Sequence, residues 1–201
     1  MYPIVESICI VNKQFRHIEL HNQRFSEACR KHFGKDAGKT PEQIIKIPQN
    51  IDNDRHKCRL TYDGNHFDYS IKPYVQRKIE SLKIVHSNSI EYSIKTTMRN
   101  QLDKLFKQRE GCDDIVIIKN GFVSDAWAAN LILFDGKKWV TPSTPLLKGI
   151  QRQNLLNSGL ISEQKIRESD LKNYQKIKLI NAMIDFAQAT EIEINNVTLR
   201  S

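Results

Sequence analysis

Apolar and polar positions alternate regularly at the start of the chain. Residues Ile4 to Val11 predict a strand, Asn12-Lys13-Gln14 a turn, and Phe15 to Glu19 a returning strand. The apolar spacing then changes to three and four residues, which predicts a helix that ends at Gly34 and has a face formed by Leu20, Arg24, Phe25, Ala28 and Phe33. The chain therefore begins with a unit of mixed strand and helix.

A second strand pair follows, Lys57 to Tyr62 and Phe67 to Ile71, around the turn residues Asp63-Gly64-Asn65. The next stretch, Tyr74 to Val85, alternates and is rich in charge. We expect a domain boundary near residues 74 to 82. It divides the chain into a small N-terminal part, residues 1–76, and a larger C-terminal part, residues 77–201.

Lys95 lies where two patterns meet. Polar and apolar residues alternate from Ser89 to Ile94, which predicts a short strand, and the apolar residues that follow have helical spacing: Met98, Leu102, Leu105 and Phe106. A lysine between a strand and a helix has its backbone fixed on both sides. We therefore expect Lys95 to be held in place rather than to move freely in water.

Asp125 follows a predicted hairpin. An apolar strand, Ile115 to Ile118, is followed by the turn dipeptide Asn120-Gly121, and Phe122 and Val123 form the returning strand. This arrangement places the carboxylate of Asp125 on a strand ladder rather than in a loop.

The later part of the chain predicts a second hairpin and a helix. Strands Ala129 to Phe134 and Trp139 to Thr141 flank an Asp-Gly-Lys-Lys turn, and Gly149 then opens a run of helical spacing. The first backbone N–H groups of a helix have no partner within it and attract anions. The candidate anion-binding groups here are the N–H groups of Ile150 and Gln151.

Composition and charge favour an ordinary globular protein. The chain has 201 residues, 39% of them hydrophobic and 27% charged. No run approaches the roughly eighteen apolar residues that a membrane span needs, and the N-terminus lacks a signal-peptide pattern, so we expect a cytoplasmic protein. The 31 basic and 23 acidic residues give a net charge of +8. They are interspersed without a nucleic-acid-binding motif, which favours a generally basic surface or small anionic ligands over nucleic acid.

Two local patterns suggest sites that the rest of the sequence does not support, and the cysteines suggest none. GKDAGKT, residues 34–40, resembles a phosphate-binding P-loop, but it has three residues between its glycines where a P-loop has four, and Pro41 follows it directly. His17 and His21 have the spacing of a metal-binding pair but no third ligand nearby. The four cysteines are widely scattered. We expect neither a metal site nor a disulfide.

Three motifs occur in order along the chain: a lysine that opens a predicted helix in YSIKTTMRNQLDKL, a carboxylate in GFVSDAWAAN about thirty residues later, and TPSTPLLKGIQR. This order resembles the class IV aminotransferase family. Its members use pyridoxal 5′-phosphate (PLP) and include D-amino-acid and branched-chain aminotransferases and 4-amino-4-deoxychorismate lyase. ESI, HNQRF and LINAMI resemble further family segments. The resemblance implies an α+β fold with a small N-terminal α/β lobe, a larger C-terminal barrel-like lobe, and the cofactor in the cleft between them.

The resemblance also implies roles for single residues. Lys95 would carry the PLP and move the proton at the substrate α-carbon, and Asp125 would keep the pyridine nitrogen protonated. Most family members have glutamate at the latter position, so the side chain here is one methylene shorter. The residues implied to bind the phosphate are Arg24, Ile150, Gln151 and Asn181.

The sequence leaves the reaction open. Arg99, four residues after Lys95, resembles an arginine of the lyases, and LINAMI favours the same group, whose reaction releases pyruvate and 4-aminobenzoate. The alternatives are transamination of a D-amino or branched-chain acid and, from another class, a non-catalytic basic binding module. The loop that binds the substrate carboxylate in the aminotransferases is short here, and Arg59 is the candidate in its place. The resemblance further implies a homodimer that acts on a small amino substrate.

Overall fold

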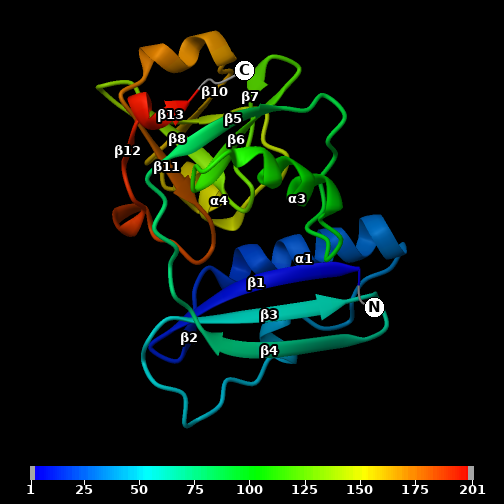
Figure 1. Cartoon of the computed structure of the whole chain (residues 1–201). Helices are drawn as coiled ribbons and strands as arrows, with labels where there is room; N and C mark the ends of the chain where they lie inside the picture. The colour runs from blue at the N-terminus through cyan, green and yellow to red at the C-terminus, as the bar shows by residue number, and fades with distance from the viewer. Residues whose placement is uncertain (1–2, 199–201) are drawn as a thin grey trace. The chain divides into compact units, whose positions relative to one another are not determined.

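The computed structural model describes residues 3–198. The chain divides into two compact units. The first contains the chain through Gln76 together with Ile94–Met98, and the second contains Arg77–Ser93 and the residues from Arg99 onward. Figure 1 shows the first unit mainly in blue and cyan and the second in green to red. The five residues around Lys95 therefore belong with the N-terminal strands, from which they are distant in sequence.

A four-stranded antiparallel sheet forms the centre of the first unit, in the order β2-β1-β3-β4. The strands are β1 Ile4–Val11, β2 Gln14–Phe15, β3 His56–Tyr62 and β4 Phe67–Pro73. The strand expected at Ile4 to Val11 and the strand pair expected around residues 63–65 are confirmed. Apolar side chains of β1 and β3 point to the same face, where they form the core of the unit.

Helix α1, Ile18–Phe33, packs against this sheet (Figure 1). It ends at Gly34, whose φ of 68° is the left-handed conformation that glycine adopts without strain. The expected strand from Phe15 to Glu19 is wrong. β2 stops at Phe15, because His17 with a φ of 53° turns the chain directly into the helix. GKDAGKT forms the loop to the short helix α2, Pro41–Ile44.

The segment around Lys95 is neither the end of a strand nor the start of a helix. The expected strand from Ser89 to Ile94 is wrong, since these residues form bends and loops, and helix α3 spans only Asn100–Phe106. Instead, the backbone N–H of Val5 donates to the carbonyl of Lys95 across 2.9 Å. The edge of β1 thus gives this segment a backbone partner that no local pattern reveals.

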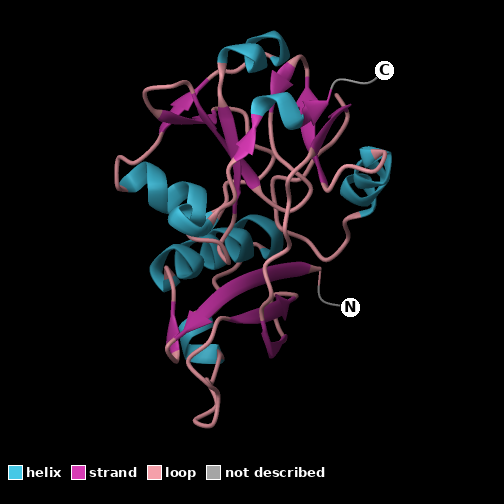
Figure 2. Ribbon diagram, turned by 60° about the vertical axis from the view of Figure 1, so that its left-hand side comes forward, coloured by secondary structure: helices cyan, strands magenta, loops and turns pink. Residues whose placement is uncertain are grey.

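Two sheets make up the second unit, with the strand orders β10-β9-β8-β11-β12 and β13-β5-β6-β7. Figure 2 draws the strands in magenta. Their bounds are β5 Leu82–His86, β6 Asp114–Lys119, β7 Phe122–Val123, β8 Asn130–Phe134, β9 Trp139–Pro142, β10 Ser162–Gln164, β11 Lys176–Ile180, β12 Ile192–Glu193 and β13 Val197–Thr198. Buried aliphatic side chains from both sheets, among them Leu82, Val116, Leu131 and Leu179, form one continuous core. This core holds the two sheets together.

The two hairpins expected in this unit are confirmed. Asn120 and Gly121 both have positive φ, 52° and 77°, as the favoured two-residue hairpin turn requires, and β6 pairs with β7 across them. β8 and β9 pair around the second turn. Helix α4, Ile150–Asn157, begins after Gly149, as expected. Asp125 itself lies two residues beyond β7, in the connection to β8, and not on a strand as expected; an isolated bridge to Asn130 is its only ladder contact among the described strands.

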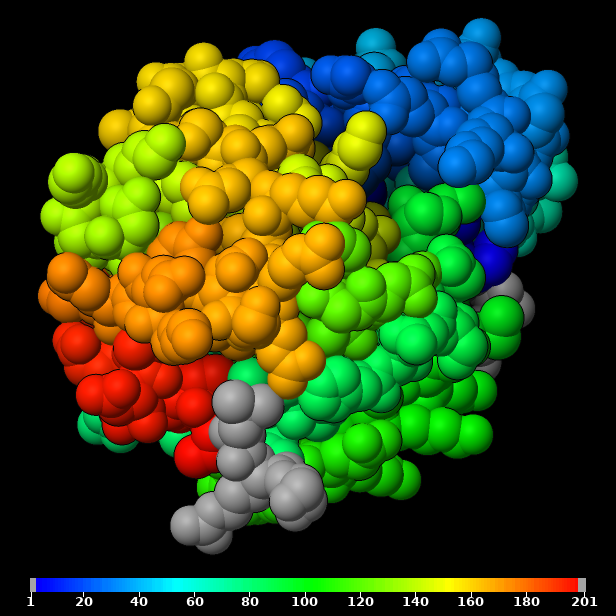
Figure 3. Space-filling model, turned by 90° about the horizontal axis from the view of Figure 1, so that it is seen from above, coloured from blue at the N-terminus to red at the C-terminus, as the bar shows by residue number. Residues whose placement is uncertain are grey.

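Four 3-10 segments of the second unit connect its strands and helices. They are η1 Lys107–Arg109, η2 Glu168–Asn173, η3 Phe186–Gln188 and η4 Ile194–Asn196. In Figure 3 the orange segment that includes η2 lies against the red C-terminal segment and against green residues of the same unit. Within residues 3–198, no helix has both the length and the apolar character that crossing a membrane requires.

Candidate functional site

Asp125 lies just after β7, in the short connection to β8. Its backbone carbonyl accepts from the N–H of Ile117 across 2.9 Å, and it forms an isolated bridge with Asn130. The side chain is buried, and both of its oxygens accept hydrogen bonds. Nδ2 of Asn130 lies 2.7 Å from Oδ1, and the N–H of Leu147 lies 3.0 Å from Oδ2. The carboxylate is therefore held in one orientation by the first residue of β8 and by the segment that precedes α4.

Burial raises the pKa of Asp125 to about 6, although the hydrogen bonds from Leu147 and Asn130 oppose the shift. A carboxylate in such surroundings lacks the water that normally stabilises its charge. A ligand that brings a positively charged N–H to this carboxylate would restore that stabilisation. The side chain is thus suited to pair with a protonated ring nitrogen.

The start of α4 is the second feature of this unit. Gly149 precedes the helix, and the side chains of Ile150, Gln151 and Arg152 are buried. The first turn of α4 contains no acidic residue that could accept from its N–H groups or repel a bound anion. Backbone N–H groups in a first turn, aligned with the helix dipole, can bind a phosphate dianion.

Arg152, the last residue of the GIQR motif, fastens this turn to the sheet. Its guanidinium donates to the carbonyl of Pro142 across 3.0 Å, to Oγ1 of Thr141 across 3.3 Å, and to Glu163 across 2.5 Å. Only 2% of Arg152 is exposed, so its bonds to Pro142 and Thr141 are buried, whereas Glu163 reaches the surface. Arg152 therefore supports the position of α4.

Arg24 belongs to a buried polar group in the first unit. Its Nε and Nη2 donate to Glu6 across 2.8 and 2.5 Å, and Nδ1 of His21 lies 2.7 Å from Oε2 of the same carboxylate. Although burial opposes ionisation, the charge of Arg24 and the hydrogen bond from His21 hold the pKa of Glu6 well below its usual range. Burial lowers the pKa of His21, against the influence of Glu6. Glu6 is thus a buried anion that fixes a neutral imidazole and a guanidinium.

Lys95 is near this polar group. Its carbonyl is bonded to Val5, the residue before Glu6, and its charge acts on His21. Ile94, beside it in the chain, packs on the core of the first unit. The structure therefore brings Lys95 and Arg24 into one unit, two residues that the sequence analysis placed in one site.

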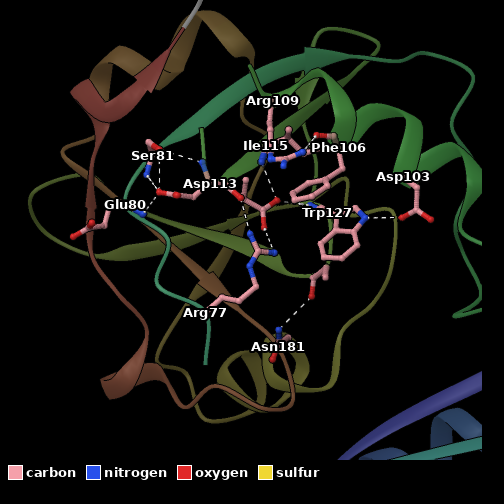
Figure 4. Close-up of polar contacts among 12 residues, drawn as sticks. Arg77, Glu80, Ser81, Asp103, Phe106, Arg109, Asp113, Ile115, Trp127 and Asn181 are labelled. Atoms are coloured by element: carbon pink, nitrogen blue, oxygen red, sulfur yellow. Dashed lines mark hydrogen bonds and ion pairs between the residues drawn. The ribbon is translucent and has the colours of Figure 1, made fainter. Parts of the chain in front are cut away.

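Asn181 and Arg99 both contact the connection between β7 and β8. Nδ2 of Asn181 donates to the carbonyl of Ala128 across 3.3 Å, a contact visible in Figure 4. Arg99 donates to the carbonyl of Trp127, and its guanidinium carbon lies 4.7 Å from the centre of that indole ring. The same connection thus holds Asp125 and receives both side chains.

Arg59 is placed differently. It lies in β3 of the first unit, opposite Ser7 of β1, and its side chain is exposed.

Glu6, His21 and Asn130 are candidate site residues to which the sequence analysis gave no role. Glu6 and Asn130 stand within the motifs ESI and GFVSDAWAAN. Their contacts with Arg24 and Asp125 join residues whose separation in the sequence matches neither the strand nor the helix repeat. The spacing of His21 from His17 indicates no such role; its Nδ1 contact with Glu6 and the effect of the Lys95 charge on it place it near this group. In the part of the chain that the structure describes, no group of three or more His, Cys, Asp or Glu side chains could hold a metal ion.

Most of this chain is similar to known proteins. The family model described as amino-transferase class IV matches residues 4–192. An uncharacterized protein of Haemophilus influenzae is 40% identical over 185 residues, which are 91% of this chain and 98% of that protein.

Solved structures have the same fold. A crystal structure titled as a "putative 4-amino-4-deoxychorismate lyase" from Haemophilus somnus has a TM-score of 0.80 and 32% identity, and the match covers 91% of this chain and 97% of that one. A hypothetical aminotransferase from Mycobacterium tuberculosis in a PLP-bound form has a TM-score of 0.70 and 16% identity, with 95% and 80% covered. The mixed helix-and-sheet fold expected from the sequence is confirmed.

Proposed function

The chain belongs to the class IV aminotransferase family, and on this premise we propose that it is a PLP-dependent enzyme that cleaves aminodeoxychorismate to pyruvate and 4-aminobenzoate. The observation that carries the PLP assignment is the buried carboxyl of Asp125, which has a raised pKa and two hydrogen bonds that fix its orientation. A group of this kind fits the protonated nitrogen of a pyridine ring. The start of α4 in the same unit fits a phosphate.

PLP, when bound, supplies an electron sink for the bonds at the substrate α-carbon. In this proposal Asp125 holds the proton on the pyridine nitrogen, which maintains that sink. The side chain is suited to this role because burial alone makes its ionised form costly, so that a neighbouring positive charge lowers the free energy of the carboxylate.

The phosphate would be bound by the N–H groups of Ile150 and Gln151 and by the guanidinium of Arg24, with Asn181 as a further donor. A guanidinium can donate two parallel hydrogen bonds to a phosphate, which a lysine cannot do. Glu6 holds Arg24 through Nε and Nη2, and so restricts the plane in which the guanidinium lies.

Lys95 would carry the PLP and then, as an amine, move the proton at the substrate α-carbon. A buried neutral His21 beside it does not add a second positive charge, because burial keeps the pKa of this imidazole low.

Two observations favour the lyase over an aminotransferase. The structure from Haemophilus somnus, to which this chain is 32% identical over most of its length, is titled as a lyase of this kind. Arg99 contacts the connection that holds Asp125, where it can act on an anionic substrate. Transamination of a D-amino or branched-chain acid is the alternative reaction of the same family.

The deciding experiment offers aminodeoxychorismate to the PLP-loaded protein without any keto acid. The proposal requires continuous release of pyruvate and 4-aminobenzoate, with no lasting loss of the cofactor absorbance. Turnover of a D-amino or branched-chain acid with 2-oxoglutarate, and none of aminodeoxychorismate, would exclude the lyase and leave the PLP assignment intact. A protein that stays colourless after incubation with PLP would favour a non-catalytic binding module.

We also propose that the enzyme acts as a homodimer, as the family resemblance implies. Light scattering of the PLP-loaded protein tests this. An active monomer would contradict the proposal.

A further inference from the structure

The side-chain amide of Asn130 stands between Asp125 and the turn that leads into α4. Its Nδ2 donates to Oδ1 of Asp125 across 2.7 Å and to the carbonyl of Leu147 across 2.8 Å. The carbonyl of Leu147 and the ionised carboxylate of Asp125 can only accept, which assigns the nitrogen rather than the oxygen to this side of the amide. Both N–H groups of the amide are then used, and only 5% of Asn130 is exposed.

These bonds close a ring. The N–H of Leu147 donates to Oδ2 of Asp125 across 3.0 Å, its carbonyl accepts from Asn130, and Asn130 donates back to Asp125. Each of the three residues contacts the other two. A movement of the turn at Leu147 therefore strains both hydrogen bonds to the carboxylate.

The oxygen of the same amide lies against Gly149. A Cβ built on Gly149 would stand 2.0 Å from Oδ1 of Asn130, much less than any real contact. The backbone of Gly149 has a φ of −72° and a ψ of 150°, which any residue can adopt. The close approach of Asn130, and not the backbone conformation, therefore requires glycine at the start of α4.

Only an amide of this length satisfies all these contacts. An aspartate has no N–H to donate and would place a second carboxylate beside Asp125. An alanine would leave a buried carboxylate oxygen and a buried carbonyl without their donor, which costs more than the bonds themselves contribute.

We propose that Asn130 is a positioning residue that couples the carboxylate of Asp125 to the first turn of α4, so that the group for the ring nitrogen and the group for the phosphate keep a fixed spacing. This inference rests on the proposed PLP function for its purpose. The coupling itself is a property of the protein without PLP, and it can be measured there.

The first test is a double-mutant cycle on the protein without PLP, with Asn130→Ala, Gly149→Ala and the double variant. Each single change should lower the urea midpoint. The double variant should be no less stable than Asn130→Ala alone, because the new Cβ occupies the space that the amide leaves. Asn157→Ala, which removes an exposed amide of the same helix, should leave the midpoint near that of the parent. Effects of the two single changes that simply add would overturn the proposal.

The second test uses Gly149→Ala alone and remains decisive if Asn130→Ala does not fold. Carbon NMR of labelled aspartate should show the carboxyl of Asp125 titrating at higher pH in this variant than in the parent, because the displaced amide no longer donates to it. An unchanged titration in a folded Gly149→Ala protein would overturn the coupling.

The third measurement links the coupling to the proposed function. Both single variants should bind PLP and inorganic phosphate on the order of tenfold more weakly than the parent. If the double-mutant cycle shows coupling but both single variants bind phosphate as the parent does, Asn130 only orients Asp125. That result would overturn the coupling to α4. If the parent binds no PLP, the proposed function fails, whereas the first two tests still decide the coupling.

Discussion

Glu6 and Arg24 form a two-point contact inside the first unit, with Nε and Nη2 of the guanidinium 2.8 and 2.5 Å from the two carboxylate oxygens. Glu6 is 1% exposed, so its charge has no contact with bulk water to replace this partner. His21 completes the group through its Nδ1 contact. The pair therefore links the stability of the first unit to the orientation of a candidate phosphate ligand.

Replacing Glu6 tests the stability side of this relationship. Glu6→Gln leaves the guanidinium without a counter-charge and should cost on the order of 3 kcal/mol of unfolding free energy, measured by urea denaturation at neutral pH. Glu27→Gln is the matched control, at an exposed glutamate of α1, the helix that carries Arg24; it accepts from Gln23 and its replacement should change little. A loss as small as that of the control would show that the contact does not stabilise the fold.

Glu6→Gln should also change how the stability of the protein depends on pH below neutrality. The pKa of Glu6 is lowered on folding, so its contribution is present above the unfolded value of about 4.5. It is lost as the pH falls below that value, because the unfolded state binds the proton first. We expect the urea midpoint of Glu6→Gln to fall less steeply below pH 4.5 than that of the parent. Parallel curves would contradict this assignment.

Arg24→Lys tests the phosphate side. The variant keeps the charge but loses the planar fork, and it should weaken PLP binding by tenfold or more. Arg30→Lys is a control on the same helix, at an exposed arginine that pairs with Asp36. Fluorescence or absorbance titration with PLP measures both variants. Equal PLP affinity in the two would remove Arg24 from the site.

Asp125→Asn tests the buried carboxyl in the protein without PLP. Folding raises the pKa of Asp125 from about 3.8 to about 6. Its protonated form is therefore favoured in the folded state, and stability is lost as the pH rises from about 4 through 6, by about 3 kcal/mol in total. The asparagine variant should lack this loss, which urea midpoints across that range will show. If both proteins lose stability in parallel over that range, the carboxyl is not perturbed.

In the loaded enzyme, Asp125→Asn should retain PLP and lose turnover by on the order of a hundredfold or more, because the neutral amide cannot hold the ring proton electrostatically. Steady-state kinetics and the absorbance of bound PLP separate the two effects. Near-native turnover would mean that the carboxylate does not act on the ring.

Lys95 is tested by chemical trapping. Reduction of the PLP-loaded protein with borohydride and peptide mapping should place the pyridoxyl group on Lys95, and Lys95→Ala should abolish trapping. Lys104→Ala, at an exposed lysine of α3, should leave it unchanged. A pyridoxyl group on another lysine would contradict the assignment.

The elements that the sequence predicts well are those determined by neighbouring residues. β1 and the strand pair β3 and β4 follow from local alternation. The hairpin before Asp125 follows from Asn120-Gly121, whose positive φ values fix the turn type. Gly149 marks the start of α4 correctly, although its close approach to Asn130 requires the structure.

The errors occur in segments whose conformation depends on contacts with residues distant in the sequence. The alternation from Ser89 to Ile94 is typical of a strand, yet among the described residues these six pair with no strand, and the Lys95 carbonyl accepts from the N–H of Val5. The helix expected at Lys95 begins only at Asn100. Glu6, His21 and Arg24 meet because α1 packs on β1, a tertiary contact that a single sequence does not encode in its spacing.

The attachment of residues 94–98 to β1 has a consequence for how the first unit comes to be completed. The N–H of Val5 donates to the carbonyl of Lys95, and the N–H of Thr97 donates to the carbonyl of Pro3. The start of β1 therefore pairs with a segment that is synthesised much later. On the ribosome, or in a fragment that stops at Gln76, these backbone groups face no partner from the chain itself. Such an open edge can pair with a second molecule. We therefore expect the fragment that stops at Gln76 to self-associate. A longer fragment that includes residues 94–98, or coexpression with a peptide of that segment, should suppress this association.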